Sequence, residues 1–160
     1  MKFSLFAHME RTNQQQSYAD MYDEFLGLCQ LADQGGMRAI WTGKHHCMDF
    51  TLTPNPFINI ADLAGKLNHV RLGTGTIIAP FWHPIKLVGE SAMTDIITSG
   101  RLELGIARGA YSYEYERLMP GMDAWEAGAR LREMIPAIRG LWNGNYAHDG
   151  EYYKFPESTS

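Results

Sequence analysis

Histidines occur at two places where short apolar segments end. His8 follows the apolar run at the N-terminus, and His45 and His46 follow Lys44 after a second apolar run. Imidazole gains or loses a proton near neutral pH, so these side chains could serve as general bases, hydrogen-bond donors or metal ligands. Adjacent histidines point in different directions, and we do not expect one shared role for them. The alternative is that one histidine binds a backbone carbonyl and the other lies on the surface.

A metal site is a second interpretation of these histidines. Asp49, His8 and His83 are the further ligand candidates. A metal-dependent hydrolase that uses His45, His46, Asp49 and His83 is an alternative function. The sequence has no HExxH motif or comparable ligand spacing. We therefore predict that the protein holds no metal.

Arg108 is the candidate for binding an anion. It follows the apolar segment Arg101–Ala107 and precedes Gly109, at the tip of a predicted strand. The guanidinium presents a fixed fork of donors that suits a phosphate. The alternative is that Arg108 forms an ion pair with Glu114 or Glu116.

Glycines interrupt the apolar segment Val70–Ile78. Gly73 and Gly75 are unfavourable inside a strand unless a bend or a close neighbour requires them, so we expect something to approach the backbone there. The string Gly73-Thr74-Gly75-Thr76 fits neither GxGxxG nor GxxxxGK followed by Ser or Thr. These two common kinds of nucleotide-binding loop are therefore disfavoured.

The elements that position these residues alternate between strands and helices. Apolar patterns and capping signals predict strands at Phe3–Ala7, Ala39–Thr42, Val70–Ile78 and Arg101–Ala107, and helices that begin near Ser17, Pro56, Pro84 and Asp123. A loop rich in Tyr and Gly precedes the last helix, which Pro136 should kink. Residues 145–155 are predicted to form a hairpin around Asp149-Gly150. We expect Trp41, Trp82 and Trp125 to lie in the core or in an interface.

Alternation of strand and helix at this spacing indicates parallel strands with right-handed crossovers. A complete (β/α)8 TIM barrel needs ~250 residues. The chain therefore supplies about the first four βα units plus a terminal hairpin, and an open doubly wound sheet is the other possibility. In both architectures ligands bind at the carboxyl ends of the strands, where His8, His45, Thr74 and Arg108 are expected.

Composition indicates an ordinary globular domain of 160 residues with a formal net charge of -4, so a basic face for nucleic acid is not expected. No apolar run approaches the ~18 residues of a membrane span, and the N-terminus is too polar for a signal peptide. We therefore predict a cytoplasmic protein. Cys29 and Cys47 lack the spacing of a zinc site and are expected to be free thiols.

Several motifs, in the correct order along nearly the whole chain, resemble the bacterial luciferase family of flavin-dependent monooxygenases. They are Met37-Arg38-Ala39-Ile40-Trp41-Thr42-Gly43-Lys44-His45-His46, Asn55-Pro56-Phe57, Val70-Arg71-Leu72-Gly73-Thr74-Gly75 with Pro80 and His83-Pro84, Ser99 to Gly109, Arg130 with Glu133, and Gly150-Glu151-Tyr152-Tyr153-Lys154-Phe155-Pro156.

The resemblance implies that residues 1–160 form one partial, half TIM-barrel domain of an oxidoreductase. It implies that the enzyme uses reduced FMN, or in some branches the deazaflavin F420, with O2 on a small organic substrate such as an aldehyde or ketone. It further implies a flavin reductase as a partner, and either a homo-oligomer such as a dimer or a complementing C-terminal half.

The resemblance also assigns roles to individual residues. His45 matches the active-site histidine of the family. Thr74, Gly75 and Thr76 match the flavin-binding segment, whose Gly75–Thr76 step corresponds to a non-proline cis peptide beneath the isoalloxazine ring. Arg108 matches a phosphate-binding arginine, with Ala110 and Arg130 as neighbours in the same site.

Lys44 departs from the family pattern, which usually has Glu at this position. The second half of the barrel, with its remaining phosphate contacts, is also not part of this sequence. These departures motivate an alternative function, a non-catalytic half-barrel that associates with itself. Unpaired parallel edges of an open barrel favour pairing with another copy.

Overall fold

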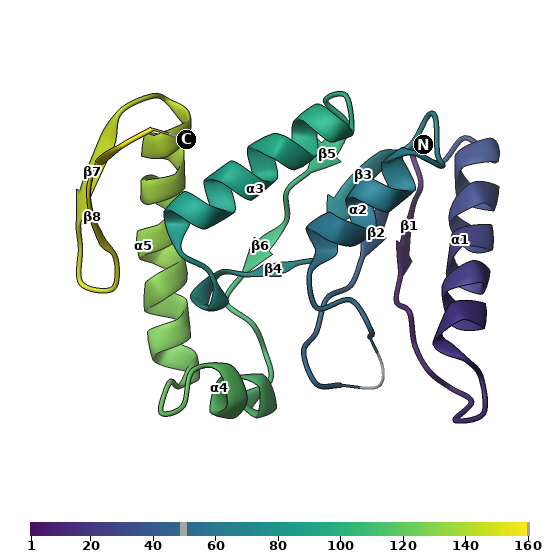
Figure 1. Ribbon diagram of the computed structural model, residues 1–160, viewed down its shortest axis with the longest axis horizontal. Helices are drawn as coiled ribbons and strands as arrows, with labels where there is room; N and C mark the ends of the chain where they lie inside the picture. The colour runs from purple at the N-terminus through teal and green to yellow at the C-terminus, as the bar shows by residue number, and fades with distance from the viewer. Residues whose placement is uncertain (49–50, 160) are drawn as a thin grey trace. The chain divides into compact units, whose positions relative to one another are not determined.

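The computed structural model describes residues 1–48 and 51–159 of the chain (Figure 1). The chain packs as two compact units. The first unit consists of residues 1–77 and 94–105, and the second consists of residues 78–93 and 106–160.

The first unit contains a four-stranded sheet. Its order is β1 (Ser4–Ala7), β2 (Ala39–Thr42), β3 (Arg71–Thr74) and β5 (Leu102–Glu103), and neighbouring strands are parallel. Ala7 is paired with Thr42, and Thr42 with Thr74, so the carboxyl ends of these strands lie at one edge. The predicted parallel order of strands is therefore confirmed.

Two helices cover this sheet, and both begin at polar caps in the sequence. Ser17 caps α1 (Tyr18–Gln34) by accepting from the backbone N–H of Asp20 over 3.1 Å, and Asn55 caps α2 (Pro56–Ala64) in the same way. One apolar core joins the helices to the strands; its buried members include Phe25, Cys29, Ile40, Ile60, Leu63 and Leu72. Cys29 and Cys47 are free thiols, as predicted.

Asp33 ties the end of α1 to the turn before β3. Its side chain is only 6% exposed, and its carboxylate accepts the backbone N–H groups of Asn68, His69 and Val70 over 3.0, 2.8 and 2.8 Å. Burial tends to raise the pKa of Asp33, but the three backbone donors outweigh it and the pKa is lowered.

The third and fourth predicted strands are each broken into two, which corrects the sequence interpretation. β3 is followed by β4 (Ile77–Ile78), and β5 by β6 (Ile106–Ala107), which pairs with β4. The break after β3 contains a cis peptide bond between Gly75 and Thr76.

The glycines near these breaks make room for groups of other strands in the sheet. A Cβ atom on Gly73 would overlap the ring of Trp41, and one on Gly75 would lie 2.5 Å from the ring of Phe6. A Cβ atom on Gly105 would overlap the carbonyl of Thr74. The predicted close approach to the strand backbone is thus made by groups of the chain itself.

The second unit is mainly helical. The 3-10 turn η1 (Ala79–Phe81) leads into α3 (Pro84–Ile97), whose last turn belongs to the first unit; α4 (Ser112–Leu118) and α5 (Ala124–Trp142) follow β6. The sequence predicted only a loop where α4 forms. Tyr115 of α4 is buried against Phe81, with ring centroids 6.0 Å apart, so tertiary packing supports this short helix.

A hairpin closes the chain. β7 (Tyr146–Asp149) and β8 (Lys154–Ser158) are antiparallel, and the N–H of Gly150 donates to the carbonyl of Tyr153 over 3.0 Å. The hairpin is confirmed, but its loop spans residues 150–153, which is longer than a two-residue turn at Asp149-Gly150.

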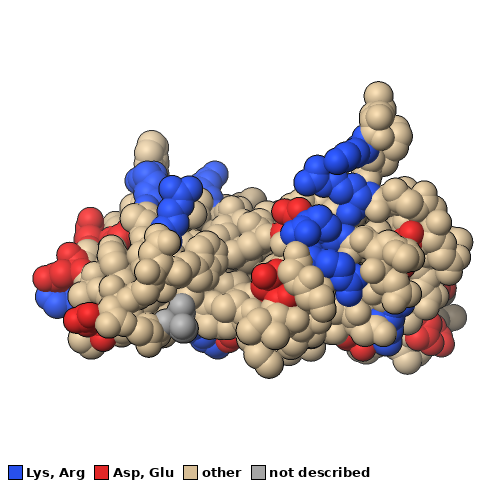
Figure 2. Space-filling view, turned by 90° about the horizontal axis from the view of Figure 1, so that it is seen from above, with Lys and Arg blue, Asp and Glu red and all other residues tan. Residues whose placement is uncertain are grey.

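Charged side chains are dispersed over the face drawn in Figure 2. Leaving aside residues 49–50 and 160, its Lys and Arg side chains form separate groups, with acidic side chains and wide uncharged areas between them. Within residues 1–48 and 51–159, no helix is both long and apolar enough to cross a membrane.

Candidate active site

The carboxyl edge of β1 and β2 carries the histidines singled out in the sequence. His8 follows β1, and residues 44–46 follow β2. The backbone N–H of Gly43 donates to the carbonyl of Ala7 over 3.1 Å, which extends the strand pairing to this point. A Cβ atom on Gly43 would overlap the His8 ring. Glycine at position 43 therefore lets the ring of His8 lie against the end of β2.

The ring of His8 is held from two sides. Its Nδ1 lies 2.6 Å from Oγ1 of Thr51, and its ring meets the ring of Phe6 edge-on at 4.8 Å between centroids. Burial lowers the pKa of His8, the nearby His45 lowers it further, and Glu10 acts in the opposite direction. The charge on the imidazole of His45 thus affects the pKa of His8.

Lys44 is buried beside the adjacent histidines. Its side chain is 1% exposed, and Nζ lies 2.6 Å from Nδ1 of His46. Cys47 follows with a φ of 56°, so the chain turns sharply directly after His46. The residue that departs from the family pattern therefore contacts a histidine of the candidate site.

Thr74, Gly75 and Thr76 lie at the same edge of the first unit. The N–H of Gly75 donates to the carbonyl of Thr42 over 2.8 Å. The hydroxyl of Thr74 donates to the carbonyl of Gly105 over 2.8 Å and accepts from the N–H of Gly105 over 2.9 Å. The hydroxyl of Thr74 thus joins the third strand to the fourth, while the Gly75–Thr76 bond has the cis geometry that the resemblance implied.

Arg108 lies in the second unit, directly after β6. Its Nη1 donates to the carbonyl of Ala124 over 3.2 Å. The side chain therefore turns toward the first turn of α5. The ion pair with Glu114 or Glu116 stays the alternative interpretation.

The backbone around Arg108 is fixed by Tyr115. The hydroxyl of Tyr115 donates to the carbonyl of Arg108 over 2.9 Å. Gly109 has a φ of 89°, and a Cβ atom there would lie 2.9 Å from Cγ2 of Ile78 and 3.0 Å from the Tyr115 hydroxyl. Glycine is therefore needed for both conformation and space. Ala110 is exposed beyond it.

A basic cavity of about 400 Å³ lies within the second unit. It is lined by Arg108, Ala124, Trp125, Gly128 and Arg132. A Cβ atom on Gly128 would lie 3.4 Å from Nη1 of Arg132 and 3.9 Å from Cδ of Arg108, so both side chains pass close to this glycine. Two guanidinium groups near the N-terminal end of a helix provide the donors and positive charge that a phosphate requires.

Arg130 does not line this cavity. Its Nε and Nη2 lie 2.8 and 2.7 Å from Oε1 of Glu126, and its guanidinium lies 4.8 Å from the centre of the Tyr152 ring. These contacts connect α5 to the hairpin. Among the described residues, the cavity brings Arg132 rather than Arg130 together with Arg108.

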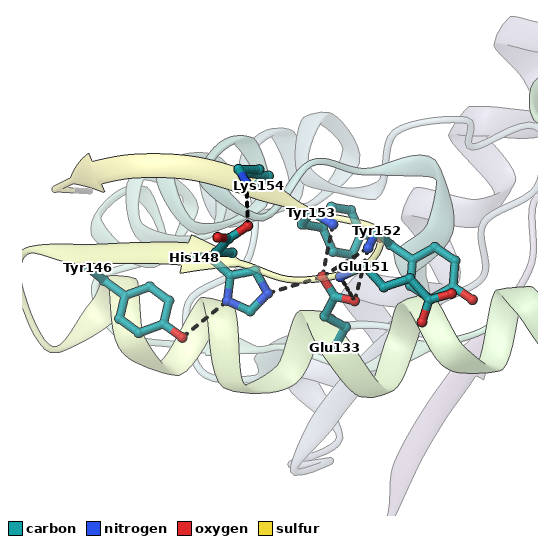
Figure 3. A network of polar contacts seen from close by, with 8 residues as sticks. Glu133, Tyr146, His148, Glu151, Tyr152, Tyr153 and Lys154 are labelled. Carbon is teal, nitrogen blue, oxygen red and sulfur yellow. Dashed lines mark hydrogen bonds and ion pairs between the residues drawn. The ribbon is translucent and has the colours of Figure 1, made fainter.

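Glu133 fastens the hairpin to α5 (Figure 3). Its carboxylate accepts the backbone N–H groups of Glu151, Tyr152 and Tyr153, the shortest bond being 2.9 Å to Tyr153. Nε2 of His148 lies 3.1 Å from the same carboxylate. Burial acts to raise the pKa of Glu133, but the backbone donors and His148 lower it more strongly, so the pKa is lowered.

Sequence reasoning missed Arg132. Trp125, which was expected in the core or in an interface, is 83% exposed within the chain and lines the cavity. Its place in an interface stays a prediction. The signal for Arg132 was its spacing of four residues from Gly128, which places both on one helix face. The spacing points to a shared cavity only once the structure shows that Arg108 approaches the turn of α5 at Gly128.

The described part of the chain contains no cluster of side chains for the metal site considered as an alternative. No group of three or more His, Cys, Asp or Glu side chains within residues 1–48 and 51–159 could hold an ion. Asp49 lies outside the described residues. His83 lies in the second unit, where its ring packs against Tyr153 and Phe155.

Comparison with known proteins gives consistent results. The sequence model of the family described as luciferase-like monooxygenase matches residues 1–160. The oxygenase component of a flavin-dependent trigonelline monooxygenase from Acinetobacter baylyi is 69% identical over 160 residues, which is 100% of this chain and 44% of that protein. The chain spans about half the length of the curated relatives it matches.

Solved structures show the same fold. The monooxygenase RslO1 from Streptomyces bottropensis superposes with a TM-score of 0.89 at 31% identity, covering 99% of this chain and 48% of that one. The oxygenating constituent of 3,6-diketocamphane monooxygenase from Pseudomonas putida, solved with FMN, superposes with a TM-score of 0.86 at 22% identity, covering 97% and 43%. The chain therefore shares the (β/α)8-barrel fold of these proteins over about half of their length.

Proposed function

Because the chain belongs to the luciferase-like monooxygenase family, we propose that it supplies the first half of a flavin-dependent monooxygenase that uses reduced FMN and O2. The structural observation that carries this proposal is the cavity shared by Arg108 and Arg132. The guanidinium donors of this cavity suit the phosphate group of FMN, a group that riboflavin lacks. The match of the family over the whole chain supports the same reaction class.

The second unit would hold the phosphate of the flavin. Arg108 and Arg132 would bind it through their guanidinium groups, and Ala110 and Arg130 would be neighbours that shape the surroundings. Arg130 is already paired with Glu126, so it would act through charge and packing. When bound, the reduced flavin supplies the electrons that activate O2.

The first unit would handle protons. His45 is the candidate for holding or moving a proton, since imidazole can do both near neutral pH. His8 is electrostatically coupled to it, and burial lowers the pKa of His8. Thr74, Gly75 and Thr76 would present their backbone to the flavin.

Trigonelline, or a closely related pyridinium carboxylate, is the proposed substrate. The supporting observation is the 69% identity with the oxygenase component named for trigonelline. A flavin reductase is the proposed partner, because that relative is named as one component of a larger system. F420 is the alternative cofactor; the F420-dependent alcohol dehydrogenase that superposes on the chain at 16% identity supports the fold alone.

The test uses the complete polypeptide that carries this chain, supplied with FMN and a flavin reductase. We expect trigonelline to be consumed together with O2 and reduced FMN. Arg108→Gln should weaken FMN binding about tenfold to a hundredfold, the equivalent of losing one charged hydrogen bond of ~1.5–3 kcal/mol, and should leave riboflavin binding unchanged. Arg117→Gln, on the exposed face of α4, is the control. Equal losses for FMN and riboflavin would argue against a phosphate contact.

A self-associating half-barrel is the second candidate function. In the described part of the first unit, β1 and β5 are the outer strands of the sheet, and each pairs on one side only. A complementing C-terminal half or a second copy could pair with these edges. Sedimentation of the 160-residue chain would test self-association: a stable monomer at micromolar concentration would exclude it. The predicted dimer and the cytoplasmic location stay predictions.

A further inference from the structure

Lys44 is a buried cation at the edge that carries the candidate histidines. We infer that Lys44 is a positioning residue, which fixes the tautomer of His46 and thereby the placement of the adjacent His45. The inference rests on the proposed function, because His45 is assigned there to proton transfer. It concerns a residue at which this chain departs from the usual family pattern.

The contact between Lys44 and His46 has a defined direction. An ammonium group has three N–H donors and no acceptor. Since Nζ of Lys44 lies 2.6 Å from Nδ1 of His46, this nitrogen accepts, and the proton of the neutral ring is on Nε2. A carboxylate at position 44 would impose the opposite tautomer, because it can only accept. The residue type at position 44 therefore decides which ring nitrogen of His46 is a donor.

The same contact restrains the segment that carries His45. On one side, the N–H of Gly43 is bonded to the carbonyl of Ala7 over 3.1 Å. On the other side, the ring of His46 is bonded to Lys44, whose side chain is 1% exposed and so is enclosed by the fold. His45 lies between these two fixed points. Removing the ammonium would loosen the segment on one side only.

The histidines thus acquire separate roles. His46 serves as a ring of fixed tautomer whose Nδ1 is occupied by Lys44, and His45 is left as the candidate for proton transfer. This agrees with the expectation from the sequence that adjacent histidines do not share one role. Misplacing a reacting group by about 1 Å can cost about a hundredfold in rate, so an indirect residue can affect turnover strongly.

The experiment is nitrogen NMR of the complete polypeptide labelled with ¹⁵N in its histidines. Long-range ¹H–¹⁵N correlations distinguish a protonated Nδ1 from a protonated Nε2, and His46→Gln assigns the signal. We expect the Nε2–H tautomer in the unmodified protein, the Nδ1–H tautomer in Lys44→Glu, and a mixture in Lys44→Met. Lys86→Met, which removes an exposed lysine of α3, should change nothing.

Kinetics provide the second readout. Lys44→Met should lower kcat about tenfold or more while the KM for the substrate and the Kd for FMN change less than about twofold. An Nδ1–H tautomer in the unmodified protein would overturn the inference, even if the variants fail to fold. An unchanged tautomer or an unchanged kcat in a folded Lys44→Met protein would also overturn it. Absence of turnover in the unmodified protein would instead count against the proposed function.

Discussion

Replacing Glu133 with Gln should release the β7–β8 hairpin from α5. The carboxylate of Glu133 accepts three backbone N–H groups at residues 151–153 and contacts Nε2 of His148 (Figure 3). Glutamine has the same shape but offers one acceptor oxygen and one NH2 group. The NH2 group would face backbone N–H donors, so about half of the hydrogen bonds would be lost. The remaining hydrogen bonds would be weaker, because the amide oxygen carries no full negative charge.

The magnitude follows from the bonds that are lost. Loss of two charge-assisted hydrogen bonds, each contributing about 1.5 kcal/mol, gives a cost of about 3 kcal/mol. Because the side chain of Glu133 is only 16% exposed, solvent offers little replacement. Opening of the hairpin should therefore become more frequent on the order of a hundredfold.

Native-state hydrogen exchange provides the assay. The amides of Tyr152 and Tyr153 should lose about a hundredfold in protection in Glu133→Gln, whereas amides in the first unit should be unaffected. Glu157→Gln, an exposed change on β8, is the matched control. Unchanged protection at Tyr152 and Tyr153 would refute the role of the carboxylate, and uniform loss across both units would refute the local effect.

The pH dependence provides a second check of the same carboxylate. Since the pKa of Glu133 is lowered in the folded protein, its contribution to stability is fully present above the unfolded pKa of about 4.5. The contribution is lost as the pH falls through the lowered pKa of the folded state. The difference in protection between the unmodified protein and Glu133→Gln should therefore shrink below about pH 4, and a difference that stays constant would contradict the assignment.

Three further substitutions test the fold around the site. Asp33→Asn should lower the free energy of unfolding in urea by about 3 kcal/mol at pH 7, because the carboxylate of Asp33 accepts three buried backbone donors. The difference in unfolding free energy between the variant and the unmodified protein should narrow as the pH falls below about 4, where the lowered pKa is approached. An equal difference at both pH values would contradict this. Gly105→Ala should reduce soluble folded protein, judged by circular dichroism and melting temperature, since its Cβ atom would overlap the carbonyl of Thr74. Tyr115→Phe should cost about 1 kcal/mol and weaken FMN binding more than riboflavin binding, because its hydroxyl fixes the carbonyl of Arg108; equal effects on the two flavins would disconnect Tyr115 from the anion site.

Local signals in the sequence predicted most of the first unit. The caps at Ser17 and Asn55, the proline at position 56 and the apolar spacing of α1 depend on groups within one or two turns, so they could be recognised without the fold. The repeated order of strand and helix then implied parallel pairing, which the structure confirms. The pattern also located the candidate histidines at the carboxyl edge of the sheet.

Long-range contacts explain what the sequence left out or misjudged. α4 forms where a loop was expected because Tyr115 finds a buried place against Phe81. Arg132 was overlooked because the cavity depends on where Arg108 lies after β6. Single residues in the sequence carry no record of such neighbours.

The sequence by itself determined the repeating architecture, the family resemblance and the residue types available for chemistry. Periodicity and capping are short-range properties, and motifs preserve the order of residues along the chain. Only the tertiary structure decided that Lys44 contacts His46, that Arg108 shares a cavity with Arg132, and that Glu133 fastens the hairpin. These outcomes depend on distances and burial within each unit, because a charged group takes its role from the partners that the fold brings within hydrogen-bond reach.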